Sequence, residues 1–129
     1  MERLCLIRDM HKQIKEFEIQ FFHYYGIGLN EAILLNSLND QIYSSSKIAD
    51  ILKLSLSNAS KVIKSAEQKG LIERMLGQED KRQMYFILTK KGHKKLSGIE
   101  KEAQAIGDVV QKIKAIDKPE IEVSRPKID

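Results

Sequence analysis

The sequence has a single cysteine, no tryptophan and only two prolines, both near its C-terminal end. One cysteine cannot form an intramolecular disulfide, so we expect a reducing, cytoplasmic setting. No apolar run approaches the roughly 18 residues of a membrane-spanning helix, and no signal-peptide pattern opens the chain. We therefore expect the 129 residues to form one globular domain that needs no membrane.

Patterns typical of catalysis and metal binding are also missing. We find no nucleophile–base pair and no phosphate-binding loop in the sequence. His11, His23 and His93 lie far apart, with no cysteine or acid at a metal-ligand spacing. The sequence therefore argues against an enzyme, and we expect neither a cofactor nor a bound metal ion.

Positive charge, in contrast, is concentrated in the middle third of the chain. Residues 53–95 contain 11 Lys and Arg against 4 Asp and Glu, whereas residues 1–52 contain 5 against 7 and residues 96–129 contain 6 against 7. This distribution is typical of a module that faces phosphate, such as a nucleic-acid-binding domain. The alternative is a chance cluster of solvated lysines.

Residues 54–70, LSLSNASKVIKSAEQKG, predict a helix with two very different faces. Its apolar residues recur at helical spacing and fit one buried face: Leu56, Ala59, Val62, Ile63 and Ala66. The opposite face carries small or cationic groups but no acid: Ser57, Ser60, Lys61, Lys64 and Gln68. The residues expected to contact a nucleic acid are Ser57, Asn58, Ser60, Lys61 and Lys64. An ordinary solvated helix would mix acids with lysines, so this face is suited to an anionic partner.

The neighbouring segments complete a recognisable order of elements. Residues 47–52, preceded by serines that can cap the helix, predict a short helix before the tight turn at residues 53–55, so the two helices form a helix-turn-helix. Residues 71–77 and 83–89 predict two strands, rich in branched and aromatic residues, that form a hairpin. Its tip carries Lys81 and Arg82, which can bind phosphate or a narrow minor groove, while Asp80 is expected to structure the turn.

Two longer helices are predicted on either side of this core. Residues 1–25 place large apolar side chains three or four positions apart. Residues 90–116 do the same in a seam that packs against another helix, often from a second copy of the chain; this helix would be roughly 40 Å long. Residues 117–129 contain both prolines and no apolar period, and we expect them to be mobile.

The central segment resembles the MarR family of bacterial winged-helix regulators. Six short motifs in one order carry the resemblance, which covers roughly residues 29–95: Ile48–Ala49, Leu54–Ser55, Ala59–Ser60–Lys61, Glu67 to Ile72, Asp80 to Arg82 and Leu88 to Gly92. The resemblance implies a mainly α fold with a small β-hairpin wing, in which a winged helix-turn-helix is flanked by N- and C-terminal dimerisation helices.

The resemblance also implies a function. A homodimer would place one recognition helix of each copy in successive major grooves of a pseudo-palindromic operator, with wing arginines at the minor groove. A small-molecule effector pocket is expected between the dimer region and the DNA-binding lobe. We therefore predict a transcriptional regulator that binds double-stranded DNA and acts as a repressor. The expected dimer contacts are Leu4, Ile7, Ile14, Phe17, Phe21, Ile99, Ile106, Val110 and Ile113.

Two alternatives stay open at this point. The first is a winged-helix adaptor that binds another protein, although such a surface would expose apolar or acidic groups where this helix carries Ser, Asn and Lys. The second concerns Cys5, which is similar in position to the reactive cysteine of peroxide-sensing relatives. Where those relatives have tyrosines, this chain has Asp9 and Ile19, which favours a merely free cysteine.

Overall fold

The computed structural model describes residues 2–76, 84–101, 107–108 and 110–111 of the chain. Within these residues it has five helices and a three-stranded antiparallel sheet. In chain order the elements are α1 (Glu2–Tyr25), α2 (Leu29–Ser37), β1 (Tyr43–Ser44), α3 (Ser45–Leu52), α4 (Leu56–Gln68), β2 (Ile72–Leu76), β3 (Met84–Leu88) and α5 (Lys90–Lys101). The predicted mainly α fold with a hairpin wing is thus confirmed.

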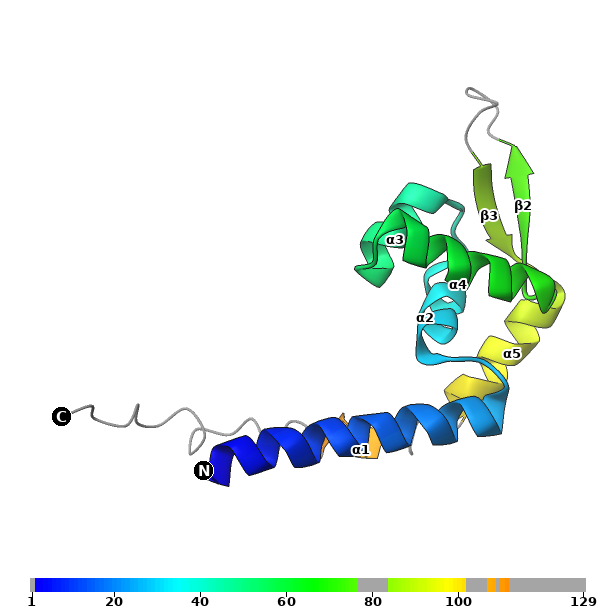
Figure 1. Ribbon diagram of the computed structural model, residues 1–129. Coiled ribbons are helices and arrows are strands. Elements are labelled where there is room, and N and C mark those ends of the chain that lie inside the picture. The colour runs from blue at the N-terminus through cyan, green and yellow to red at the C-terminus, as the bar shows by residue number, and fades with distance from the viewer. Residues whose placement is uncertain (1, 77–83, 102–106, 109, 112–129) are drawn as a thin grey trace.

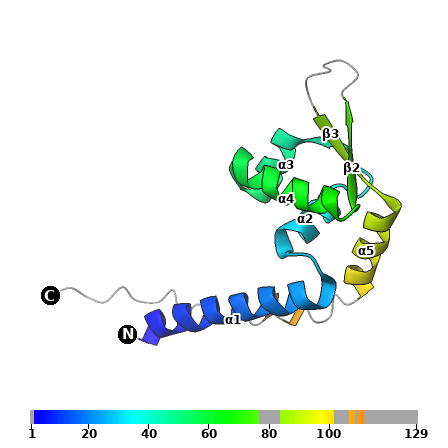
Figure 2. The ribbon, with the colours of Figure 1, turned by 45° about the vertical axis from the view of Figure 1, so that its right-hand side comes forward.

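The elements divide between a long helix and a compact lobe (Figure 1). Helix α1 extends along the lower edge of the molecule, and α2, α3, α4 and the sheet form the lobe above it. Helix α5 runs from the base of the wing back towards the C-terminal end of α1, and the hairpin of β2 and β3 projects away from α1 in both ribbon views (Figure 2).

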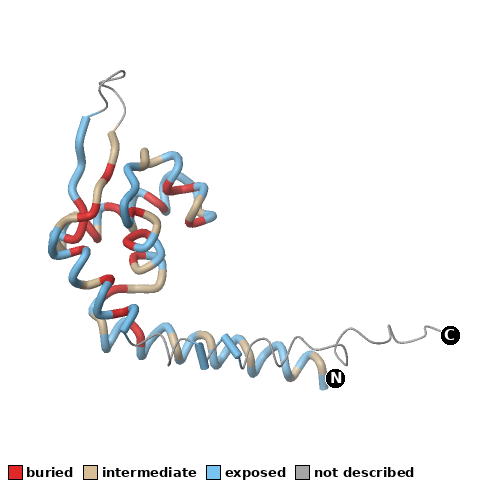
Figure 3. The backbone as a smooth tube through the Cα atoms, turned by 180° about the vertical axis from the view of Figure 1, so that it is seen from behind, coloured by how far each residue is buried: buried red, intermediate tan, exposed pale blue. Residues whose placement is uncertain are grey.

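The core lies inside the lobe and reaches α1 only at that helix's C-terminal end (Figure 3). Phe21 is the one residue of α1 that is buried among those the structure describes. Its ring lies between those of Phe17 and Tyr25, with centroid distances of 5.8 and 4.7 Å. These aromatic side chains therefore join α1 to the lobe, while most of α1 is left outside the core.

Short polar residues define where the two helices of the helix-turn-helix begin. The Ser44 hydroxyl accepts a hydrogen bond from the Lys47 amide at 3.2 Å and caps α3, and Ser55 does the same for the Asn58 amide at 3.1 Å, capping α4. Between the helices Lys53 adopts a left-handed conformation, with φ 56° and ψ 42°. This conformation ends α3 and starts the tight turn.

The sheet holds the wing at its base and leaves its far end exposed. Strand β3 lies between β1 and β2, with Tyr43 opposite Phe86 and Ile72 opposite Leu88. Ile72, Phe86 and Leu88 are buried, whereas the rest of β2 is exposed. The base of the hairpin is therefore packed into the core, whereas the side chains of β2 beyond Ile72 remain exposed.

Gly92 marks the closest approach between α5 and the base of the wing. A Cβ atom at this position would lie 2.1 Å from the Leu71 carbonyl oxygen and 2.6 Å from Leu88 Cδ1. Thr89 holds the same junction, because its hydroxyl donates to the Gly70 carbonyl at 2.6 Å and accepts from the Gly92 amide at 3.0 Å. The sequence Leu88–Thr89–x–x–Gly92 thus locks α5 to the hairpin.

We expect Gly92→Ala to lower the free energy of unfolding by about 1–3 kcal/mol or more, because the contact with a backbone oxygen cannot be relieved by a side-chain rotation. Gly98→Ala is the matched control, since the structure places nothing within 4 Å of a Cβ there. It should raise the stability by about 0.5–1 kcal/mol through helix propensity. Chemical denaturation of both variants tests this, and equal effects would contradict the close packing.

Candidate nucleic-acid interface

Helix α4 presents the predicted polar face to solvent. Ala59, Ile63 and Ala66 are buried and hold the helix against the core. All five residues predicted to contact DNA are exposed: Ser57, Asn58, Ser60, Lys61 and Lys64. The structure therefore brings the five predicted recognition residues together on one surface.

Leu56 departs from the sequence prediction. Helical spacing assigned it to the buried face, but its side chain is 59% exposed. It is the first residue of α4, directly after the capping Ser55, and the buried face begins only at Ala59. The prediction was wrong for Leu56 because periodicity gives the side of a helix but not how far the core extends along it. Leu56 thus adds an apolar group to the polar surface.

Lysines of α5 bind the C-terminal ends of two other helices, α4 and α1. The end of α4 is also marked by Gly70, whose φ of +73° is a conformation that glycine adopts readily. The Lys91 ammonium group donates to the Lys69 carbonyl at 2.8 Å, and Lys95 donates to the Tyr25 carbonyl at the end of α1, also at 2.8 Å. Two lysines of the run TKKGHKK therefore bind helix ends, while Lys90 and Lys94 are exposed.

Glu67 and Arg74 join α4 to strand β2. The Arg74 guanidinium donates to both carboxylate oxygens of Glu67, at 2.8 and 2.7 Å, and lies 5.9 Å from the centroid of the Phe86 ring. The hydrogen bond from Arg74 lowers the pKa of Glu67, and Glu67 in turn raises the pKa of Arg74. Because Glu67 is the acid of α4, this pairing leaves no uncompensated carboxylate on the helix.

The predicted wing-tip residues cannot be placed in the same way. Asp80, Lys81 and Arg82 fall in residues 77–83, outside the described residues. The structure does show the strand ends that bound this segment, with Leu76 opposite Met84.

The predicted dimer contacts are distributed unevenly. Leu4 and Ile7 are 65% and 56% exposed on α1, and Ile14 and Phe17 are half-buried. Phe21 and Ile99 are buried in the core of the chain itself, so a partner could cover little more of them. Val110 is exposed, and Ile106 and Ile113 lie outside the described residues.

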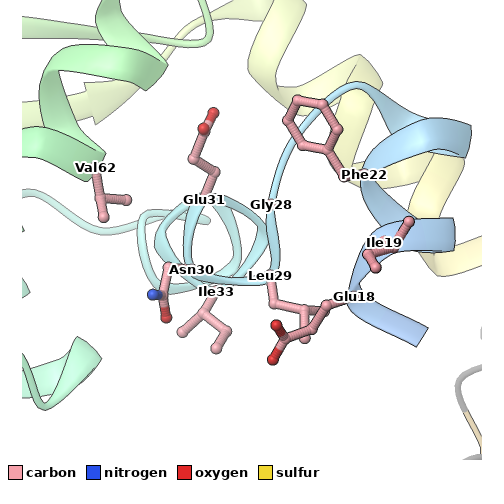
Figure 4. Close-up of a pocket in the computed structure, with 9 residues that line it drawn as sticks. All are labelled: Glu18, Ile19, Phe22, Gly28, Leu29, Asn30, Glu31, Ile33 and Val62. Atoms are coloured by element: carbon pink, nitrogen blue, oxygen red, sulfur yellow. The ribbon is translucent and has the colours of Figure 1, made fainter. Parts of the chain in front are cut away.

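A cleft of about 590 Å³ lies between α1 and α2 and reaches α4 (Figure 4). Ile19 and Phe22 of α1, Ile33 of α2 and Val62 of α4 supply its apolar lining, with Glu18, Asn30 and Glu31 among the polar groups. A cleft of this size can take a small organic molecule. The cleft thus lies between α1 and the lobe that carries α4.

Other functional groups are sparse in the described part of the chain. No cluster of three or more His, Cys, Asp or Glu residues could hold a metal ion there. Cys5 is half-buried on α1 and forms no disulfide. Among the helices that the structure describes, none has the length and apolar content required to cross a bilayer.

The family of the chain follows from a direct match. The family model of the winged helix DNA-binding domain matches residues 28–92, which is half of the chain. The chain therefore belongs to the winged-helix DNA-binding domain family. No curated protein sequence matches the chain.

Several solved structures have a fold similar to that of this chain. The S. aureus MepR–DNA complex has a TM-score of 0.70 at 20% identity, over 93% of this chain and 83% of that one. The MarR family transcription regulator SP03579 has a TM-score of 0.71 at 17% identity, over 86% and 74%. BldR from Sulfolobus solfataricus has a TM-score of 0.67 at 21% identity, over 87% and 81%. The fold is thus that of MarR-family regulators, which confirms the predicted resemblance.

The Glu67–Arg74 pair should stabilise the fold in a pH-dependent way. The pKa of Glu67 is lowered on folding, so the stabilisation is present above the ordinary carboxyl value of 4.5 and is lost as the pH falls through the lowered pKa. Because the pair is partly exposed, we expect Glu67→Gln to cost about 0.5–1 kcal/mol at neutral pH, and less as the pH falls below 4.5.

Glu73→Gln provides the control for this measurement, since Glu73 is exposed on β2 next to Arg74 and forms no ion pair with another described residue. Urea denaturation of both variants between neutral and acidic pH gives the comparison. A deficit for Glu67→Gln that does not change with pH would show that the charge of Glu67 is not what stabilises the contact.

Proposed function

We propose that the protein is a sequence-specific transcriptional regulator, acting in the cytoplasm as a homodimeric repressor on a pseudo-palindromic operator. The observation that carries this proposal is the exposed face of α4, where hydroxyls, an amide and two lysines stand without a free acid. Such a face suits the major groove, whose base edges offer hydrogen-bonding groups between two rows of phosphates.

The residues of α4 divide by reach and chemistry. Ser57, Asn58 and Ser60 are short and lie in the first turns of the helix, which approach base edges most closely in helix-turn-helix proteins. Lys61 reaches either a base edge or phosphate, and Lys64 reaches phosphate. Leu56 adds an apolar contact of the kind that thymine methyl groups accept.

The wing supplies a second contact in this proposal. Lys81 and Arg82 belong to the segment between Leu76 of β2 and Met84 of β3, and these two strands project from the same lobe as α4 (Figure 1). Lysine and arginine in this position bind phosphate or enter a narrow minor groove, whose potential is strongly negative. Asp80 would hold the turn or orient Arg82.

In this proposal the dimer forms through α1, which exposes large apolar side chains to solvent. Leu4 and Ile7 are more than half exposed, far from the core of the lobe. Covering them with a second α1, together with the segment after α5 that contains Ile106, Val110 and Ile113, would remove this apolar area from water. Two recognition helices about 34 Å apart would then reach successive major grooves.

A small ligand would bind in the cleft between α1 and α2 in this account. Because the cleft contacts both α1 and, through Val62, the recognition helix, its occupant can favour one orientation of α4 relative to α1. This gives a physical route by which a ligand could release DNA.

A protein-binding adaptor is the second candidate. An adaptor would need apolar or acidic side chains on the exposed face of α4. Among the described residues, Leu56 is the single large apolar side chain exposed on that helix. Because the surrounding side chains are Ser, Asn and Lys, the surface favours DNA.

Lysines on α4 should control the salt dependence of DNA binding. We expect Lys61→Ala and Lys64→Ala each to weaken binding to a mixed-sequence duplex and to reduce the slope of log K against log salt by about 0.9 per lost phosphate contact. Arg82→Ala should do the same through the wing. Fluorescence anisotropy between about 50 and 200 mM salt measures the slope.

Lys12→Ala controls for net charge, because Lys12 is exposed on α1, away from the lobe. Its slope should match that of the wild type. If Lys61→Ala and Lys64→Ala change the slope no more than Lys12→Ala does, α4 is not the DNA-binding surface.

The exposed apolar residues of α1 should hold the dimer together. We expect the double change Leu4→Asp and Ile7→Asp to give a folded monomer, because both side chains lie outside the core of the chain. Ile42→Asp, at a residue that is 55% exposed beside β1, should leave the dimer intact. Sedimentation equilibrium gives the mass of each variant, and a doubly substituted dimer would remove α1 from the interface.

A further inference from the structure

Glu31 is the one charged side chain that is buried among the described residues, with 8% of its surface exposed. It lies on α2, and both partners that the structure gives it belong to α4 or the end of that helix. The Ser65 hydroxyl donates to its carboxylate at 2.9 Å, and the Lys69 ammonium group donates to both carboxylate oxygens, at 2.9 and 3.0 Å.

A buried carboxylate is a poor choice if stability alone is required. Removing a charge from water is costly, and apolar residues of similar volume often stabilise a fold as well as a buried ion pair does. Apolar contacts are not directional, however, and the apolar packing of α2 against α4 would tolerate small rotations. Hydrogen bonds to Ser65 and Lys69, one turn apart, fix both the rotation and the axial position of α4.

Lys69 extends this contact to the rest of the molecule. Its ammonium group lies 5.7 Å from the centroid of the Phe22 ring on α1, and its carbonyl accepts the hydrogen bond from Lys91 on α5. Four helices thus meet at one residue. Figure 4 shows Glu31 directed from α2 into the space between Val62 on α4 and Phe22 on α1, so the same carboxylate also lines the cleft.

We propose that Glu31 is a positioning residue for DNA binding, which sets the orientation of the recognition helix relative to α1 through Ser65 and Lys69. This inference rests on the proposed function of α4. It also gives the cleft a specific connection to α4, because an occupant that contacts Glu31 acts on the carboxylate that holds the helix.

Neutralising one partner at a time tests the proposal. Glu31→Gln keeps the shape and an acceptor for Ser65 but loses the charge, and Lys69→Met keeps the length of the side chain without its ammonium group. We expect each change to weaken binding about tenfold to the best duplex selected from a random pool, a loss the size of one charge-assisted hydrogen bond. The double variant should bind no more weakly than the weaker single variant, because the two groups act as a unit.

Binding is measured per folded dimer, after titration of the competent fraction, so that a loss of stability does not count as a loss of affinity. Asp9→Asn is the matched control, since Asp9 also accepts from a cation, Arg8, but on the exposed surface of α1. It should bind as the wild type does. Wild-type affinity per folded dimer in Glu31→Gln, with only a lower melting temperature, would reduce Glu31 to a stabilising role and overturn the proposal.

A measurement without DNA separates this inference from the proposed function. Spin labels on Lys12→Cys and Lys64→Cys, in a Cys5→Ser background diluted with unlabelled protein, report the distance between α1 and α4 within one chain. We expect a narrow distribution that broadens or shifts on Glu31→Gln. An unchanged distribution overturns the positioning role. A broadened distribution sustains it, and if the unlabelled wild-type protein then binds no duplex, DNA binding is refuted instead.

Discussion

Burial of one face of α4 is the constraint on which the rest of the structure depends. Ala59, Ile63 and Ala66 hold the helix against the core, and the two alanines are small enough to let its backbone come close to its neighbours. The serine cap at Ser55 and the left-handed Gly70 then set where the buried face starts and stops. With one face fixed in this way, the opposite face is held rigidly in solvent.

The same packing decides which of the many basic side chains remain available. Four cations of the basic middle segment are bound within the protein: Lys69, Arg74, Lys91 and Lys95. They fix the ends of helices and connect α4 to α2 and β2. Lys61 and Lys64 form no ion pair with the described residues and lie exposed on α4. The basic side chains of the segment therefore fall into two groups. One group holds α4 and its neighbours in place, and the other gives the exposed face of α4 a positive electrostatic potential.

Much of this could be predicted from the sequence because it depends on local signals. The serine caps, the glycine at residue 70, the two strands and the Thr89 cap each depend on neighbours within a few residues. Glu31 could not be recognised, because its partner Lys69 is 38 residues away and an isolated glutamate is usually solvated. Leu56 was misplaced because the extent of the core is a tertiary property. The roles of Lys91 and Lys95 could not be predicted for the same reason, since the carbonyl groups that bind them lie at helix ends distant in the sequence.

Selection of bound duplexes from a random double-stranded pool tests the central claim most directly. The account predicts recovery of an inverted repeat with half-site centres about one helical turn apart, or a multiple of that spacing, bound with a steep dependence on salt. Such a result would show that the protein binds DNA sequence-specifically as a dimer and would identify its operator. Weak binding without sequence preference would contradict the account and would favour a surface that binds another protein.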